Sequence, residues 1–109
     1  MSIDLPSPVA LYVDNENTAN VDALGEYFAP DATVRDESRT YEGLAAIREW
    51  KVESRRQYSH SLAPLAVSQR DGRTVLKAVV AGTFPGSPVT LDFSFRLENG
   101  KIAALEIQG

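Results

Sequence analysis

The stretch YFAPDATVRD, residues 27–36, carries the most information about the fold of this chain. If it is a strand, Ala32, Val34 and Asp36 point to one face, because side chains alternate along a strand. An apolar row that ends in a carboxylate indicates the mouth of a pocket, since a buried carboxylate is costly and marks functional sites. The alternative is that the strand ends at Val34 and that Asp36 is an ordinary loop aspartate.

Size and composition place the chain in a single soluble domain, residues 1–109. It is 43% hydrophobic and 24% charged, as globular proteins are. It has no cysteine, which excludes disulfides and thiolate sites, and its one histidine, His60, excludes any site that needs two. We expect no metal and no cofactor.

The charge and the N-terminus exclude several partners. A net charge of −4 argues against nucleic acid, which selects a basic surface. Residues 1–6 lack the basic and apolar regions of a signal peptide, and the most apolar segment, 74–83, is too short to span a bilayer. We therefore expect no membrane partner and, by elimination, a cytoplasmic location.

The first half of the sequence predicts three helices. The first begins at Ser7-Pro8 and loses its apolar pattern near residue 15. The second is capped by Asn20 and ends before Pro30; the third follows Gly43 and runs to about residue 57. Its basic residues between 48 and 56, Lys51 among them, alternate with glutamates and are typical of a solvated helix face.

The second half predicts strands. Asp71-Gly72 and Asn99-Gly100 suit two-residue hairpin turns, and Pro85-Gly86 suits a type II turn. These turns separate four runs, residues 60–70, 73–84, 89–98 and 101–108, which together predict an antiparallel meander. Helices followed by a meander give an α+β fold.

The run 73–84 is apolar on both faces. One face carries Val75, Val79 and Ala81, and the other carries Leu76, Ala78 and Val80. Helices can cover one face, and a second copy of the chain can cover the other, so we expect a homodimer through the outer sheet face. The alternative is that the small side chains tolerate exposure.

Several segments together resemble a known superfamily. They are residues 27–36, Tyr41-Glu42-Gly43, residues 45–50, and residues 95–97 with 100–102. The chain resembles the nuclear transport factor two-like superfamily, in the branch that holds ketosteroid isomerase and SnoaL-like polyketide cyclases. The resemblance covers nearly the whole chain. It implies a cone-shaped, curved antiparallel sheet packed on three helices, a cystatin-like roll, with an apolar pocket inside and frequent homodimers through the outer sheet face.

The resemblance also implies roles for particular residues. Asp36 stands where the isomerase pattern has its general base, and Tyr12 stands where a helix tyrosine donates to the oxyanion. The second oxyanion donor of the pattern is an acid, whose position falls on Phe93. Asp92 is adjacent, but strand alternation points it to the opposite face. Unless a bulge shifts the register, the second donor is missing.

The remaining candidates are residues of the pocket wall and mouth. The predicted ligand-binding residues are Phe28, Val34, Trp50, Tyr58, His60, Phe93 and Phe95. Each has an alternative reading: the aromatic residues and Tyr12 as core, and His60 as a surface or capping residue.

Three functions fit these features. The first is an isomerase, cyclase or dehydratase that acts without a cofactor on a small apolar carbonyl compound, with Asp36 as base and Tyr12 as donor. The second is a non-catalytic binder of a small hydrophobic ligand. The third is a dimeric structural module whose cone is filled by side chains.

Overall fold

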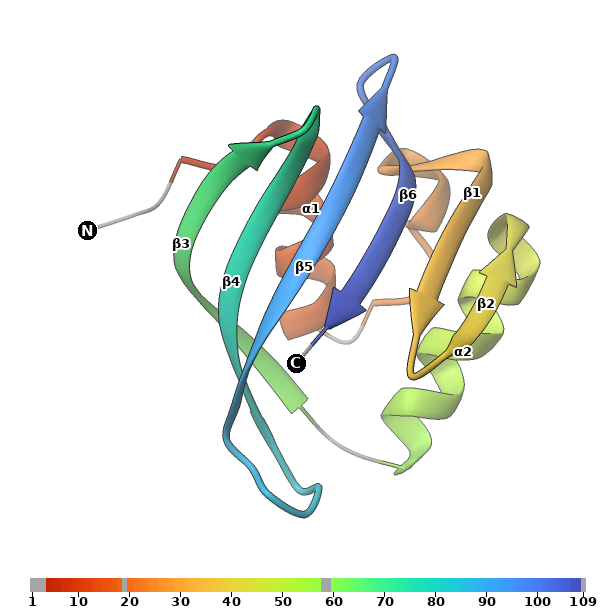
Figure 1. Cartoon of the computed structure of the whole chain (residues 1–109). Helices are drawn as coiled ribbons and strands as arrows, with labels where there is room; N and C mark the ends of the chain where they lie inside the picture. The colour runs from red at the N-terminus through yellow and green to blue at the C-terminus, as the bar shows by residue number, and fades with distance from the viewer. Residues whose placement is uncertain (1–3, 19, 58–59, 109) are drawn as a thin grey trace.

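A six-stranded curved sheet wraps around two helices in the computed structural model (Figure 1), which describes residues 4–18, 20–57 and 60–108. The elements in chain order are α1 (Ser7–Asn17), the 3-10 turn η1 (Leu24–Glu26), β1 (Phe28–Asp36), β2 (Arg39–Glu42), α2 (Gly43–Gln57), β3 (His60–Arg70), β4 (Arg73–Gly82), β5 (Val89–Glu98) and β6 (Lys101–Gln108). Figure 1 shows both helices behind the sheet, α1 behind β3 to β6 and α2 behind β1 and β2. The α+β class is confirmed.

The strand order is β2-β1-β6-β5-β4-β3, and β3 to β6 form the expected antiparallel meander. The first strand lies beside the last: β1 and β6 run parallel, with Val34 opposite Leu105. Their register shifts between Phe28 and Thr33, a bulge that accommodates Pro30, which has no N–H to donate.

The predicted alternation of buried and exposed side chains is present in β1 up to Asp36. Ala32 and Val34 are fully buried, Arg35 is exposed, and Asp36 is half-buried as the last residue of the strand. A two-residue turn of Glu37 and Ser38 then returns the chain, so that Asp36 lies opposite Arg39. Both turn residues have positive φ, 52° and 67°. Such angles cost energy for residues other than glycine, and a strained turn of this kind is often found at functional sites.

The prediction of a second helix is wrong, and the described residues form two α-helices in place of the expected three. Within the described residues, only the η1 turn is helical between α1 and β1. Asn20 does accept a hydrogen bond, from the Asp22 N–H at 2.9 Å, but it closes a local turn. Tyr27 accepts from the Ile102 N–H at 2.7 Å, so pairing with β6 draws residues 27 and 28 into the sheet. Tertiary pairing overrides the apolar spacing at this point.

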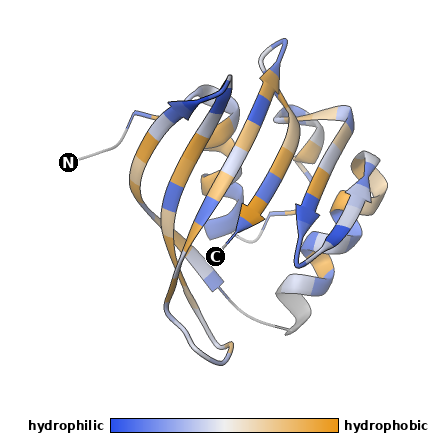
Figure 2. Ribbon diagram, viewed as in Figure 1, coloured by the Kyte–Doolittle hydropathy of each residue, from blue (hydrophilic) through white to orange (hydrophobic). Residues whose placement is uncertain are grey.

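The core lies between the inner sheet face and the helices. Along β4, Thr74, Leu76, Ala78 and Val80 are buried, whereas Val75, Val79 and Ala81 are half-exposed on the other face. Figure 2 shows hydrophobic and polar residues alternating along the strands. Within the described part of the chain, no helix is long and apolar enough to cross a membrane.

Candidate active site

A cavity of about 1040 Å³ lies between the helices and the inner sheet face. Its deep wall is buried, and it reaches exposed residues such as Glu37 and Arg39. Several residues on its wall can transfer protons or donate hydrogen bonds. They include Tyr12 and Glu16 from α1, Asp36 from β1, Trp50 and Lys51 from α2, and His60 from β3. A cavity of this volume has room for a small organic ligand.

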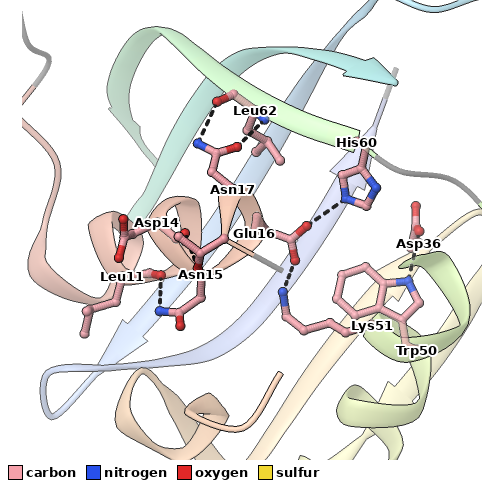
Figure 3. A network of polar contacts seen from close by, with 11 residues as sticks. Leu11, Asp14, Asn15, Glu16, Asn17, Asp36, Trp50, Lys51, His60 and Leu62 are labelled. Carbon is pink, nitrogen blue, oxygen red and sulfur yellow. Dashed lines mark hydrogen bonds and ion pairs between the residues drawn. The ribbon is translucent and has the colours of Figure 1, made fainter. Parts of the chain in front are cut away.

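Asp36 is fixed by Trp50. The indole Nε1 of Trp50 donates a hydrogen bond to Asp36 Oδ2 at 3.1 Å (Figure 3). Burial raises the pKa of the Asp36 carboxyl above its ordinary value, and the nearby Glu37 charge adds to the rise, while the Trp50 bond opposes it. The result is a positioned carboxylate that holds a proton more readily than an exposed aspartate does.

Trp50 is itself held in place. It is 9% exposed, and its ring packs against Tyr41 from β2 with ring centroids 5.9 Å apart. Because α2 packs against β1 and β2, the indole meets the end of β1, where Asp36 lies. The predicted wall residue Trp50 therefore lines the cavity and also orients the predicted base.

Tyr12 lies at the buried end of the cavity. It is 1% exposed, and its ring packs edge-on against Phe95 at 5.4 Å and tilted against Phe93 at 6.1 Å. The Lys51 ammonium lies 4.5 Å from the centre of the Tyr12 ring. Tyr12 and Asp36 thus line the same cavity, and Tyr12 also packs with the aromatic core.

A buried charge cluster completes the wall. Glu16 Oε1 pairs with the Lys51 ammonium, and Glu16 Oε2 lies 2.8 Å from His60 Nε2 (Figure 3). The side chain of Lys51 is 3% exposed, that of Glu16 8% and that of His60 15%. One carboxylate therefore holds a cation from α2 and an imidazole from β3.

The placement of Lys51 corrects the expectation of a solvated helix face. Arg48 is exposed as expected and pairs with Asp22 at 3.2 Å, but Lys51 points inward. The signal in the sequence was its spacing: Lys51 follows the buried Ile47 by four residues, and Glu16 follows Tyr12 by four. Both charges continue an apolar helix row, which places them on the inner face.

The other predicted ligand-binding residues divide into two groups. Trp50, His60 and Phe93 line the cavity. Phe28, Val34 and Phe95 are fully buried in the core and are not among the described lining residues. Tyr58 lies outside the described residues.

The register of β5 leaves Asp92 away from the cavity. The register of β5 against β6 shifts only between Arg96 and Leu97, beyond this part of the strand. In the register of β4 and β5, Asp92 lies opposite Lys77. Phe93, 3% exposed, therefore occupies the inward position at which the isomerase pattern has an acid.

The fold and the cavity define an α+β pocket protein, in which a curved six-stranded sheet and two helices surround a ligand-sized cavity. The sequence model of the SnoaL-like domain matches residues 9–105. The chain belongs to the SnoaL-like domain family, and the resemblance inferred from the sequence is confirmed.

Several solved structures have the same fold. A candidate polyketide cyclase from Sinorhizobium meliloti is 44% identical, with 99% of each chain covered and a TM-score of 0.93. A protein from Catenulispora acidiphila with a ketosteroid isomerase-like fold, solved with trimethylamine, is 20% identical over 97% of this chain and 87% of that one, with a TM-score of 0.84. A candidate polyketide cyclase from Pseudomonas putida is 18% identical over 99% and 92%, with a TM-score of 0.82. No curated protein matches the chain.

Proposed function

We propose that the cavity is the active site of an enzyme that moves a proton next to a carbonyl group, with Asp36 as the general base. The reaction belongs to the isomerase, cyclase or dehydratase kind and uses this chain's own residues for the proton transfer. The observation that carries the proposal is the half-buried Asp36 on the cavity wall, oriented by Trp50 and with its pKa raised by burial.

A raised pKa suits a general base. Proton abstraction from carbon is fastest when the base has a pKa near the working pH, and burial moves an aspartate in that direction. The bond from Trp50 fixes the carboxylate without a second charge, so a substrate carbon can meet it in one orientation.

The rest of the wall indicates the kind of substrate. Apart from its charged groups, the cavity is lined by apolar side chains from β3, β4 and β5, such as Leu62, Val80, Leu91 and Phe93. Such walls favour a small, largely hydrophobic compound, and a few polar groups then set its orientation. The size of the cavity counts against a structural module whose cone is filled by side chains.

A non-catalytic binder of a small hydrophobic ligand is the second candidate. It is favoured by Phe93, which stands where the isomerase pattern has an acid and cannot donate to an oxyanion. In this case Asp36 only orients the ligand. In such a protein the bound ligand raises the melting temperature, and the ligand is not turned over.

The test is hydrogen–deuterium exchange at the carbon next to the carbonyl. A panel of small cyclic ketones in deuterated buffer is followed by NMR with the wild-type protein, Asp36→Asn and Asp31→Asn. We expect Asp36→Asn to slow exchange by about 10²–10⁴-fold, the usual contribution of a general base. Asp31 is an exposed aspartate of the same strand and serves as the matched control, whose rate stays at the wild-type value.

Two results decide between the candidates. Exchange that persists at the wild-type rate in folded Asp36→Asn removes Asp36 as the base. A ketone that raises the melting temperature of the wild-type protein but is never exchanged supports the binder.

A further inference from the structure

The cluster of Glu16, Lys51 and His60 has no part in the function proposed so far. From its geometry we infer that Lys51 is a catalytic residue that receives the carbonyl oxygen of a substrate that is neutral when it binds, and that Glu16 positions Lys51. This inference rests on the proposed function in one respect, the assignment of the proton transfer to Asp36.

The location of Lys51 points to a role in the cavity. Lysine is almost never fully buried unless it is paired, and here a lysine whose side chain is 3% exposed is among the residues that line the cavity. A buried ion pair is a weak source of stability, because apolar side chains of similar volume often stabilise a fold equally well. A structural link between α1 and α2 therefore explains the pair poorly.

The Lys51 ammonium is held from several sides. Glu16 pairs with it through Oε1 and is itself tied to His60 through Oε2. The Lys51 nitrogen lies 4.5 Å from the centroid of the Tyr12 ring and 5.6 Å from the centroid of the Trp50 ring. Aromatic faces attract a cation, so carboxylate and rings together fix a charged donor before any substrate arrives.

Lys51 and the proposed base Asp36 both contact Trp50. The same Trp50 indole donates its N–H to Asp36 and lies close to the Lys51 ammonium. Asp36 lies at the N–H edge of the indole (Figure 3), and the Lys51 nitrogen lies over its ring, 5.6 Å from the ring centroid. A flat carbonyl compound that lies along this ring can place its acidic carbon at Asp36 and its oxygen at Lys51.

The charges of the cavity select the neutral form of the substrate. Among the described lining residues, five carboxylates (Glu16, Asp36, Glu37, Glu49, Glu53) outnumber three permanent cations (Arg39, Arg48, Lys51). A free anion is disfavoured in such surroundings, whereas a neutral carbonyl can accept a hydrogen bond from the ammonium. Negative charge then develops on the oxygen only during the reaction, so Lys51 stabilises the transition state more than the bound substrate.

The proton transfer balances without a further reactant. The Asp36 carboxylate takes the proton from the carbon beside the carbonyl, and the electron pair of that C–H bond becomes the new carbon–carbon double bond. The π pair of the carbonyl moves to its oxygen, which becomes an enolate that the Lys51 ammonium stabilises. Asp36 then returns a proton to carbon, and this proton carries the solvent isotope once the carboxyl has exchanged with water. Lys51 thus supplies the donor that Phe93 cannot.

A naphthol tests this oxyanion site directly, because its ionised oxygen mimics the enolate and its absorption spectrum separates the ionised from the neutral form. All proteins carry Asp36→Asn, so that the base and its charge play no part. The first protein carries Asp36→Asn alone. The second is a triple variant that also carries Glu16→Gln and Lys51→Met. The third is a double variant that carries Asp36→Asn and Lys51→Arg. Lys77→Met, at an exposed lysine of β4, is the matched control.

At about two pH units below the pKa of the free naphthol, we expect the Asp36→Asn protein to raise the ionised fraction of bound naphthol at least about tenfold. The triple variant removes both partners of the ion pair, so it leaves no unpaired charge, and it should bind naphthol in the neutral form. Lys51→Arg should restore part of the ionised band, and Lys77→Met should match the Asp36→Asn protein.

The inference is overturned if the Asp36→Asn protein binds naphthol only as the neutral molecule or not at all. It is equally overturned if the folded triple variant ionises naphthol as strongly. Failure of Asp36 as the base appears in the ketone exchange experiment and leaves these spectra unchanged, so the two failures are distinguishable.

Discussion

At the scale of single residues, the pKa of Asp36 links function to stability. Burial raises this pKa in the folded state, so the folded chain holds the proton more tightly than the unfolded chain does. The stability that this proton contributes is fully present below the unfolded pKa and is lost as pH rises through the folded pKa. A general base with this pKa becomes active over the same rise in pH.

The prediction is a pH-dependent effect of Asp36→Asn. The amide keeps an acceptor for the Trp50 N–H but carries no charge, so we expect the variant to melt at a higher temperature than the wild type at neutral pH. The difference should vanish in acid, below the unfolded pKa. Melting curves of both proteins across this pH range, followed by circular dichroism, measure it. A difference that is constant with pH contradicts the raised pKa.

Tyr27 offers a second prediction at this scale. Its ring is fully buried, and its hydroxyl has no hydrogen-bond partner among the described residues. A buried polar group without a partner costs about 1–3 kcal/mol, so Tyr27→Phe should raise the free energy of unfolding by about 1 kcal/mol. Urea denaturation measures the change. Tyr41→Phe, at a half-exposed ring, is the control and should have little effect; a loss of stability in Tyr27→Phe would show that the hydroxyl is satisfied.

The candidate site was predictable from the sequence only in part. Asp36 was found because period-two alternation places a carboxylate at the end of a buried row. Glu16 and Lys51 were missed because charges on helices are usually solvated, and the two residues are paired only across two helices that pack around one cavity. Their burial depends on tertiary geometry, which helix spacing alone does not supply.

At the scale of elements, Asn17 joins the end of α1 to the start of β3. Its amide donates to the Leu62 carbonyl at 3.0 Å and accepts from the Leu62 N–H at 2.7 Å (Figure 3). In this way it completes the backbone hydrogen bonding of one residue on an edge strand.

Asn17→Ala should therefore lower the free energy of unfolding by about 1–3 kcal/mol, the sum of two ordinary hydrogen bonds. Asn17→Asp keeps the acceptor and loses the donor, so its loss should be about half as large. Equilibrium denaturation of the three proteins tests the difference. Equal stability of Asn17→Ala and wild type would show that water replaces both bonds at no cost.

Elements with strong local signals were predicted well, and those that depend on distant partners were not. Asp71-Gly72 and Asn99-Gly100 both adopt the positive φ that their turns need, which sets the meander. The turn at Glu37 and Ser38 has the same angles without glycine or asparagine, so nothing in its composition revealed it. The segment from Asn20 to Phe28 has helical spacing, but its end pairs with β6, which is far away in the sequence.

At the scale of the whole molecule, the outer sheet face remains uncovered within the single chain. Val75, Val79 and Ala81 are half-exposed there, and Val75 and Val79 lie opposite Ser94 and Thr90 of β5. The α+β fold covers the inner face of β4, and a second copy of the chain would cover the apolar residues of the other face. We therefore predict a homodimer that forms through the outer sheet face.

We expect the wild-type protein to sediment with twice the mass of the chain, and Val79→Lys to sediment as a monomer, because it replaces an apolar side chain of this face with a second positive charge next to Lys77. Val79→Thr keeps the shape of the side chain and is the control, which should remain dimeric. Analytical ultracentrifugation over a range of concentrations makes the measurement. A wild-type monomer at every concentration refutes the outer-face dimer.

The position of β6 between β1 and β5 has a consequence for biosynthesis. While the nascent chain leaves the ribosome, β1 and β2 can form their hairpin and β3 to β5 their meander, but the two parts share no strand pairing until β6 follows. One edge of β1 and one edge of β5 stay open in the meantime, and open edges attract foreign strands. The strand β6, which is translated after the other five, thus closes the sheet, and synthesis interrupted before β6 should leave a fragment that requires a chaperone.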